Sequence, residues 1–179
     1  LPREYGTNLT SGMHNDVPGF SWGLAGALAM AGVKYLCLGV PAWYCEAVPA
    51  HPCWDEDGVV TFEVPAGFWW EVPNGQKLFT WSNLHGGELN PLGYHDCFEK
   101  LPDMIEKLER NNYAWDSVCY TVGSGHRDNS PPSYRFVELA QQWADKWSYP
   151  RVINSTNEMF LSEVSQNTAS FKTLRGEFP

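Results

Sequence analysis

Two residues that can bind a metal, His14 and Asp16, flank Asn15 just after an apolar stretch at residues 8–13. A Pro-Gly turn follows, and a helix is then expected. Loops at the carboxyl ends of strands are where α/β proteins hold their ligands, so a carboxylate at this place indicates chemistry. An imidazole and a carboxylate side by side offer two ligands to a divalent metal. Asp16 could instead begin the turn and cap the helix, and both interpretations stay open.

A second polar loop, at residues 123–130, follows a strand expected at 115–122 and contains His126 and Asp128. The carboxyl ends of parallel strands lie on one face of a barrel, so Asp16 and Asp128 could converge there. His126 could bind a metal or hydrogen-bond to a neighbour. The alternatives are a turn residue before a helix for Asp128 and a solvated loop histidine for His126.

Aromatic residues are unusually frequent, with 9 Trp, 8 Tyr and 9 Phe, and the net charge is −9. Acidic, tryptophan-rich clefts suit sugars, because rings stack on the C–H faces of pyranoses while carboxylates bind hydroxyls. Trp43, Tyr44 and Trp81 are the expected stacking residues, with an ordinary core role as the alternative. His85 and His95 flank a glycine-rich segment and are expected to line the same carbohydrate site.

Charge and hydropathy exclude other classes of partner. The 12 Lys and Arg residues are scattered, whereas nucleic-acid binding needs them clustered. No apolar stretch approaches the roughly 18 residues of a membrane-spanning helix. The sequence therefore predicts no nucleic-acid partner and no membrane segment.

Four residues favour a secreted, extracellular glycoprotein. Asn8 and Asn154 each begin an Asn-x-Ser/Thr triplet, which is the acceptor pattern for N-glycosylation. Cys45 and Cys53 flank a proline-containing loop and could form a disulfide, which requires an oxidising compartment.

Strands alternate with helices along the chain. A strand at 8–13, a helix at 19–31 that stops at Gly32, and a strand at 34–39 predict a strand–helix–strand unit with parallel strands. Pro73-Asn74-Gly75 predicts a hairpin turn. Further strands are expected at 59–64, 67–72, 77–82, 115–122 and 151–153, and further helices from Pro102, after Pro131-Pro132, and at a capping box in 155–158. The expected fold class is α/β, as a single domain over residues 1–179.

The order of these motifs resembles the catalytic barrel of glycoside hydrolase family 38, the α-mannosidases, and more closely a poorly characterised branch of family-38-like proteins. In the family, a strand ends in an Asp-Pro-Phe-Gly-like motif, and a helix, an Ala-Gly pair and an apolar strand follow. The matching segments are 16–19 (DVPG), 31–36 (AGVKYL), 68–78 (FWWEVPNGQKL), 126–133 (HRDNSPPS) and 174–177 (LRGE).

The resemblance implies a (β/α) barrel of the glycoside hydrolase/deacetylase type, with mostly parallel strands. Asp16 would be the nucleophile and would also touch a divalent metal, usually zinc. His14 and His126 are further candidate ligands because of their residue type and position, not because of the resemblance. Asp128 would be the acid/base. The implied activity is metal-assisted, retaining hydrolysis of α-linked glycans.

The sequence also departs from the family pattern. The family's opening His-x-Asp metal pair lies on an earlier strand, and residues 14–16 could be mistaken for it. A later metal-binding histidine is expected beyond Gly176. The chain is therefore expected to be an incomplete barrel, completed by other chains of the same larger or nicked protein. A non-catalytic, lectin-like carbohydrate-binding protein and a polysaccharide deacetylase are the alternative functions.

Overall fold

The structure is a computed structural model, and it divides the chain into two compact units that are described separately. The first unit comprises residues 1–54, 60–85 and 156–179, and the second comprises residues 55–59 and 86–155. The described residues are 4–15, 19–40, 67–84, 101–103, 105–106, 109–110, 113, 115–119, 134–166 and 171–177.

The first unit opens with the predicted strand–helix–strand motif. Strand β1 (Ser11–Asn15) is followed by helix α1 (Trp22–Met30) and strand β2 (Tyr35–Val40). The two strands are parallel, with Ser11 opposite Tyr35 and Asn15 opposite Gly39. Strand β1 lies slightly later in the chain than the predicted 8–13, so His14 belongs to the strand itself.

Local signals set both ends of α1. Ser21 is the N-cap, and its Oγ accepts a hydrogen bond from the Leu24 amide at 3.1 Å. Gly32 has φ +93°, and the amides of Gly32 and Val33 donate to the carbonyls of Ala29 and Leu28, each at 3.0 Å. This paired ending is the Schellman motif and confirms the predicted stop. The N-cap residue is therefore Ser21, and Asp16, which the sequence also offered as a cap, lies outside the described residues.

A β-hairpin supplies the centre of the sheet. Strands β3 (Gly67–Glu71) and β4 (Lys77–Leu84) are antiparallel, and Trp70 pairs with Leu78. Gly75 adopts φ +83° in the connecting turn, which confirms the predicted Pro-Asn-Gly turn. The side-chain oxygen of Asn74 accepts from the Gln76 amide at 3.0 Å and tightens the turn.

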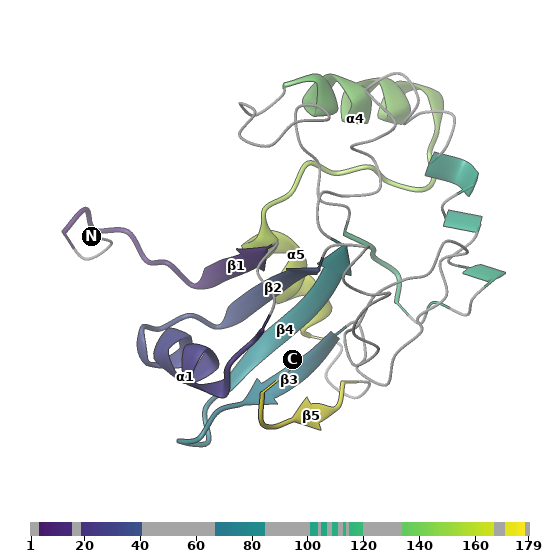
Figure 1. Cartoon of the computed structure of the whole chain (residues 1–179). Coiled ribbons are helices and arrows are strands. Elements are labelled where there is room, and N and C mark those ends of the chain that lie inside the picture. The colour runs from purple at the N-terminus through teal and green to yellow at the C-terminus, as the bar shows by residue number, and fades with distance from the viewer. Residues whose placement is uncertain are drawn as a thin grey trace. The chain divides into compact units, whose positions relative to one another are not determined.

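The sheet has the order β1-β2-β4-β3-β5, where β5 is the short strand Thr173–Leu174. β1, β2 and β4 run parallel, and Figure 1 shows β3 running against them. β5 is parallel to β3. Three of the four ladders are therefore parallel, which confirms a mixed α/β fold with mostly parallel pairing. Within the described strands the sheet is open, with β1 and β5 at its two ends.

The two faces of the sheet pack against different helices. Residues that face α1 include Leu36, Leu38, Phe68 and Trp70, all at most 2% exposed. On the other face, Trp81 packs edge-on against Phe160 of helix α5 (Asn157–Val164), with ring centroids 5.1 Å apart. Burial on both faces is expected for the parallel part of a sheet.

The start of α5 differs from the predicted capping box. Thr156, not Ser155, is the N-cap, and its side chain accepts from the Met159 amide at 3.2 Å. Glu158 accepts a hydrogen bond from Thr10 Oγ1 instead of reaching back to the cap. A long-range partner therefore outweighs the local pairing of the capping box.

The second unit contains helix α4 (Arg135–Lys146), which confirms the predicted helix after Pro131-Pro132. Trp143 is 3% exposed, and its indole N–H donates to the Pro150 carbonyl at 2.6 Å. Residues 101–103, 105–106 and 109–110 are helical, as expected.

Two predicted strands are absent from the part of the second unit that is described. Residues 115–119 and 151–153 are not in strands. A short apolar run forms a strand only when a neighbouring strand pairs with it, and no such pairing occurs there. The strand predicted at 59–64 lies outside the described residues. Across the described segments, no helix has the length and apolar character to span a membrane.

Candidate functional site

The three parallel strands end level with one another. Asn15 of β1 pairs with Gly39 of β2, which pairs with Asn83 of β4. Figure 1 shows the arrowheads of these strands directed to the same side of the sheet. We call this side the carboxyl edge. Segments that follow parallel strands leave from one edge and so meet there.

Four predicted site residues follow these strand ends along the chain. Asp16 is the residue after β1, Trp43 and Tyr44 come after β2, and His85 is the residue after β4. All four lie outside the described residues, so their side-chain positions are not part of the geometry. What the structure does describe is that the three strands preceding them end at one edge, which the sequence alone did not establish for β4.

His14 is the predicted site residue whose surroundings are best defined. It is half-buried near the end of β1, opposite Leu38, and its ring lies edge-on to Phe20 with centroids 5.0 Å apart. Its Nδ1 atom is buried and has no hydrogen-bond partner among the described residues. A buried ring nitrogen without a partner is costly unless a ligand or another group completes it. A neutral imidazole nitrogen is also the commonest protein ligand for metals.

The fit to a metal therefore rests on His14. In the described segments, no group of three or more His, Cys, Asp or Glu side chains gathers to hold an ion. The other predicted ligands, Asp16 and His126, lie outside those segments. The described residues therefore offer one atom that could bind a metal, Nδ1 of His14, which lies at the carboxyl edge two residues before Asp16.

Trp81, one of the predicted stacking residues, is part of the core. It is 3% exposed, and a methyl group added at Gly67 would lie 2.8 Å from its ring. Together with the Phe160 contact, this packing leaves no ring face open to a sugar. Of the two roles that the sequence left open for Trp81, the structure supports the core role.

The remaining predicted residues divide by location. Asp128, His126 and His95 belong to the second unit, whereas Cys45 and Cys53 belong to the first. All five lie outside the described residues. The convergence of Asp16 and Asp128 stays a prediction.

The two glycosylation candidates differ in their surroundings. Asn8 and Asn154 are both exposed, which suits an acceptor residue. The side-chain amide of Asn154, however, donates to the Phe136 carbonyl at 3.0 Å. Asn154 therefore has a structural contact that a glycan at its amide nitrogen would have to accommodate.

One position at the carboxyl edge escaped the sequence interpretation. Asn83 lies in β4 at the level of Asn15, whereas the predicted strand ended at residue 82. A polar residue two positions before His85 was the available signal. Because β4 extends to Leu84, Asn83 lies at the carboxyl edge.

Comparison with known proteins gives the fold a context. The sequence model described as the glycosyl hydrolases family 38 N-terminal domain matches residues 1–179. An α-mannosidase from Enterococcus faecalis V583 is similar in structure, with a TM-score of 0.65 and 16% sequence identity. The similarity covers 98% of this chain and 18% of that one, so the chain spans under a fifth of that mannosidase. At this identity the likeness concerns the fold. A search of curated proteins finds no match.

Proposed function

Since this chain belongs to glycosyl hydrolase family 38, we propose that its carboxyl edge forms part of the active site of a glycoside hydrolase acting on α-linked glycans. The observation that carries the proposal is the level ending of β1, β2 and β4, with Asp16 and His85 as the next residues. The similar fold of a solved α-mannosidase supports the choice of glycan.

The proposed reaction is a retaining hydrolysis with two carboxyl groups. Asp16 attacks the anomeric carbon while Asp128 gives a proton to the leaving glycosidic oxygen. Asp128 then takes a proton from the water that releases the sugar from Asp16. The two groups must lie about 5 Å apart for this sequence of steps. Trp43 and Tyr44 would stack on sugar rings, and His85 and His95 would hydrogen-bond to hydroxyls.

His14, Asp16 and His126 are the proposed ligands of a divalent metal, in the first place zinc. The unpartnered Nδ1 atom of His14 supports this assignment. A bound cation supplies positive charge that keeps the neighbouring carboxylate ionised and orients a sugar hydroxyl. The protein's own part is to hold the His14 ring edge-on to Phe20, so that it is oriented before any ligand arrives.

The decisive experiment compares the protein with its Asp16→Asn variant in hydrolysis of an aryl α-mannoside. Turnover should fall at least about a thousandfold, because the amide cannot attack the anomeric carbon. Asp103→Asn, the same change at an exposed position, is the control. Undiminished turnover in Asp16→Asn would remove Asp16 from the nucleophile role.

The same assay separates the alternative functions. A wild-type protein that binds mannosides without cleaving them is a lectin-like module. Release of acetate from an acetylated polysaccharide would instead indicate a deacetylase. Zinc content, measured on wild type and Asp16→Asn, tests the metal independently of turnover.

Wider features of the family are proposals of the same kind. We expect β1, β2 and β4 to belong to a (β/α) barrel, completed by other chains of the same protein if it is nicked. Secretion, glycans at Asn8 and Asn154, and a disulfide between Cys45 and Cys53 go together. The mass of the protein, with and without enzymatic deglycosylation and reduction, tests the glycans and the disulfide, and the presence of the protein in the culture medium of its own cells tests secretion.

A further inference from the structure

Residues 171–177, which we call the strap, are held on the sheet through a short backbone pairing. Only Thr173 and Leu174 form a strand, and they pair with Trp69 and Trp70 of β3. The Trp69 amide donates to the Lys172 carbonyl at 2.8 Å. A two-residue strand is too short to be stable through its ladder alone, so side chains must hold the strap in place.

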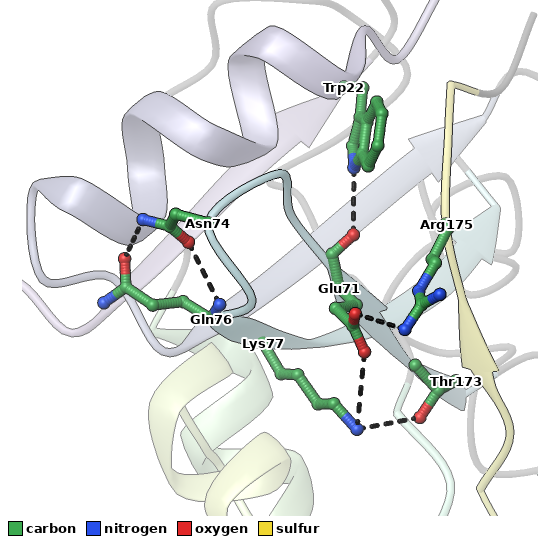
Figure 2. A network of polar contacts seen from close by, with 7 residues as sticks. All are labelled: Trp22, Glu71, Asn74, Gln76, Lys77, Thr173 and Arg175. Carbon is green, nitrogen blue, oxygen red and sulfur yellow. Dashed lines mark hydrogen bonds and ion pairs between the residues drawn. The ribbon is translucent and has the colours of Figure 1, made fainter.

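The polar anchor of the strap is the carboxylate of Glu71, at the end of β3. Arg175 Nη2 lies 2.5 Å from Glu71 Oε1, and Lys77 Nζ lies 3.8 Å from Glu71 Oε2. Lys77 also donates to Thr173 Oγ1 at 3.2 Å. Figure 2 shows the two cations approaching Glu71 from two sides, with Thr173 beside Lys77. One carboxylate thus joins the strap to the β3–β4 hairpin.

A buried tryptophan also depends on the strap. Trp70 is fully buried, and its indole N–H donates to the Gly176 carbonyl at 2.9 Å. Gly176 has φ +94°, a conformation that turns the backbone as glycine readily allows. Without the strap, a buried N–H group would lose this partner, which opposes release.

An aromatic anchor lies on the opposite face of the sheet. Phe171 is 9% exposed and packs edge-on against Phe79 of β4, with centroids 4.9 Å apart. Gly67 separates it from Trp81, since a methyl group there would lie 2.7 Å from Phe171 and 2.8 Å from Trp81. The strap therefore completes the aromatic packing against β4, three residues before the strand ends at Leu84.

We propose that the strap is an ion-pair latch: Glu71 holds it on β3, and its release loosens the aromatic packing that supports the carboxyl end of β4. The Glu71 side chain is 18% exposed, whereas those of Lys77 and Arg175 are 44% and 69% exposed. Salt therefore reaches the cations and weakens the latch. Loss of the carboxylate leaves two positive charges facing each other, which drives the strap away.

Hydrogen exchange of Glu71→Gln tests the latch. Amides of the strap and of residues 79–84 should exchange about fivefold faster than in the wild-type protein, because both ion pairs of the partly buried Glu71 are lost. Arg175→Gln removes the cation through which the strap pairs with Glu71, but Lys77 keeps its carboxylate partner. Because no repulsion between two cations arises, the increase in exchange should be smaller than in Glu71→Gln. Glu4→Gln, the same change at an exposed position outside the sheet, is the matched control and should exchange as the wild type does.

The response to salt identifies the cause. Sodium chloride should speed exchange of the strap in the wild-type protein, because it screens an attraction. In Glu71→Gln it should slow exchange, because it screens the repulsion between Lys77 and Arg175. Strap exchange equal to that of Glu4→Gln would overturn the latch. Faster exchange in the strap with unchanged residues 79–84 would overturn its coupling to β4.

Discussion

The hairpin end of the sheet and its carboxyl edge differ in how their polar groups are used. At the hairpin end, near Lys77, the carboxylate of Glu71 has two cationic partners, and its backbone carbonyl accepts from the Trp22 indole at 2.9 Å. At the carboxyl edge, the buried Nδ1 atom of His14 has no partner among the described residues.

The difference supports the proposal that the hairpin end serves stability and the carboxyl edge serves binding. Buried polar groups in proteins are nearly always paired, so an unpaired one usually belongs to a functional site. At the hairpin end, ion pairs and hydrogen bonds from indole N–H groups to carbonyls satisfy the polar groups and hold β3, β4 and β5 together. At the carboxyl edge, an unsatisfied ring nitrogen is left where a ligand can use it.

Replacing His14 by phenylalanine should have the largest effect on binding. Zinc affinity should fall at least about a hundredfold, because a proposed ligand is lost. The free energy of unfolding, measured without metal, should stay the same or rise by about 1 kcal/mol, because an unpaired buried nitrogen is removed beside Phe20. Competition with a coloured chelator and denaturant unfolding measure the two quantities.

Two results would contradict this expectation. Wild-type zinc affinity in His14→Phe would remove His14 from the metal site. A clear loss of stability in metal-free protein would mean that the nitrogen has a structural partner.

Replacing Trp70 by phenylalanine is the corresponding change at the hairpin end. It removes the hydrogen bond to the Gly176 carbonyl and leaves space in a fully buried site, so unfolding should become easier by about 2 kcal/mol. Trp147→Phe, at a ring that is 48% exposed, is the control and should change stability little. If the two variants lowered the free energy of unfolding equally, the hydrogen bond and the packing of the Trp70 indole would not stabilise the hairpin end. Denaturant unfolding followed by circular dichroism measures both.

Ser21→Ala should have the smallest effect. Loss of the N-cap of α1 should cost about 1 kcal/mol of stability, while zinc affinity stays unchanged, because Ser21 satisfies only the helix start. Ser11→Ala, outside any cap, is the control. A loss of zinc affinity in Ser21→Ala would contradict this expectation, because it would show that a residue assigned to stability also contributes to binding.

Several features could be predicted because they depend on neighbouring residues. Gly32 ends α1 and Gly75 makes the hairpin turn, since each adopts a positive φ that other residues resist. The helix at Arg135–Lys146 follows from hydrophobic periodicity. The strand–helix–strand unit follows instead from apolar runs that are bounded by a Pro-Gly turn and by Gly32. Asp16 was chosen as a candidate site residue because it follows an apolar run, and the structure places it directly after β1 in the chain.

Other features could not be predicted, because distant residues decide them. The antiparallel strand β3 lies between β4 and β5, although β3 precedes β4 in the chain. The runs at 115–119 and 151–153 have strand-like composition, but none of the described strands pairs with them. Trp81 resembled a sugar platform in composition, yet packing against Phe160 makes it part of the core.

By itself the sequence determined the turns, the helix ends, the parallel β1–α1–β2 unit and the family to which the chain belongs, because each depends on residue types at short spacing. Only the tertiary structure decided that β4 pairs with β2, that β1, β2 and β4 end level, and that Glu71 anchors the strap. These features depend on which distant segments exclude water together, and the free energy of that choice is spread over the whole sheet.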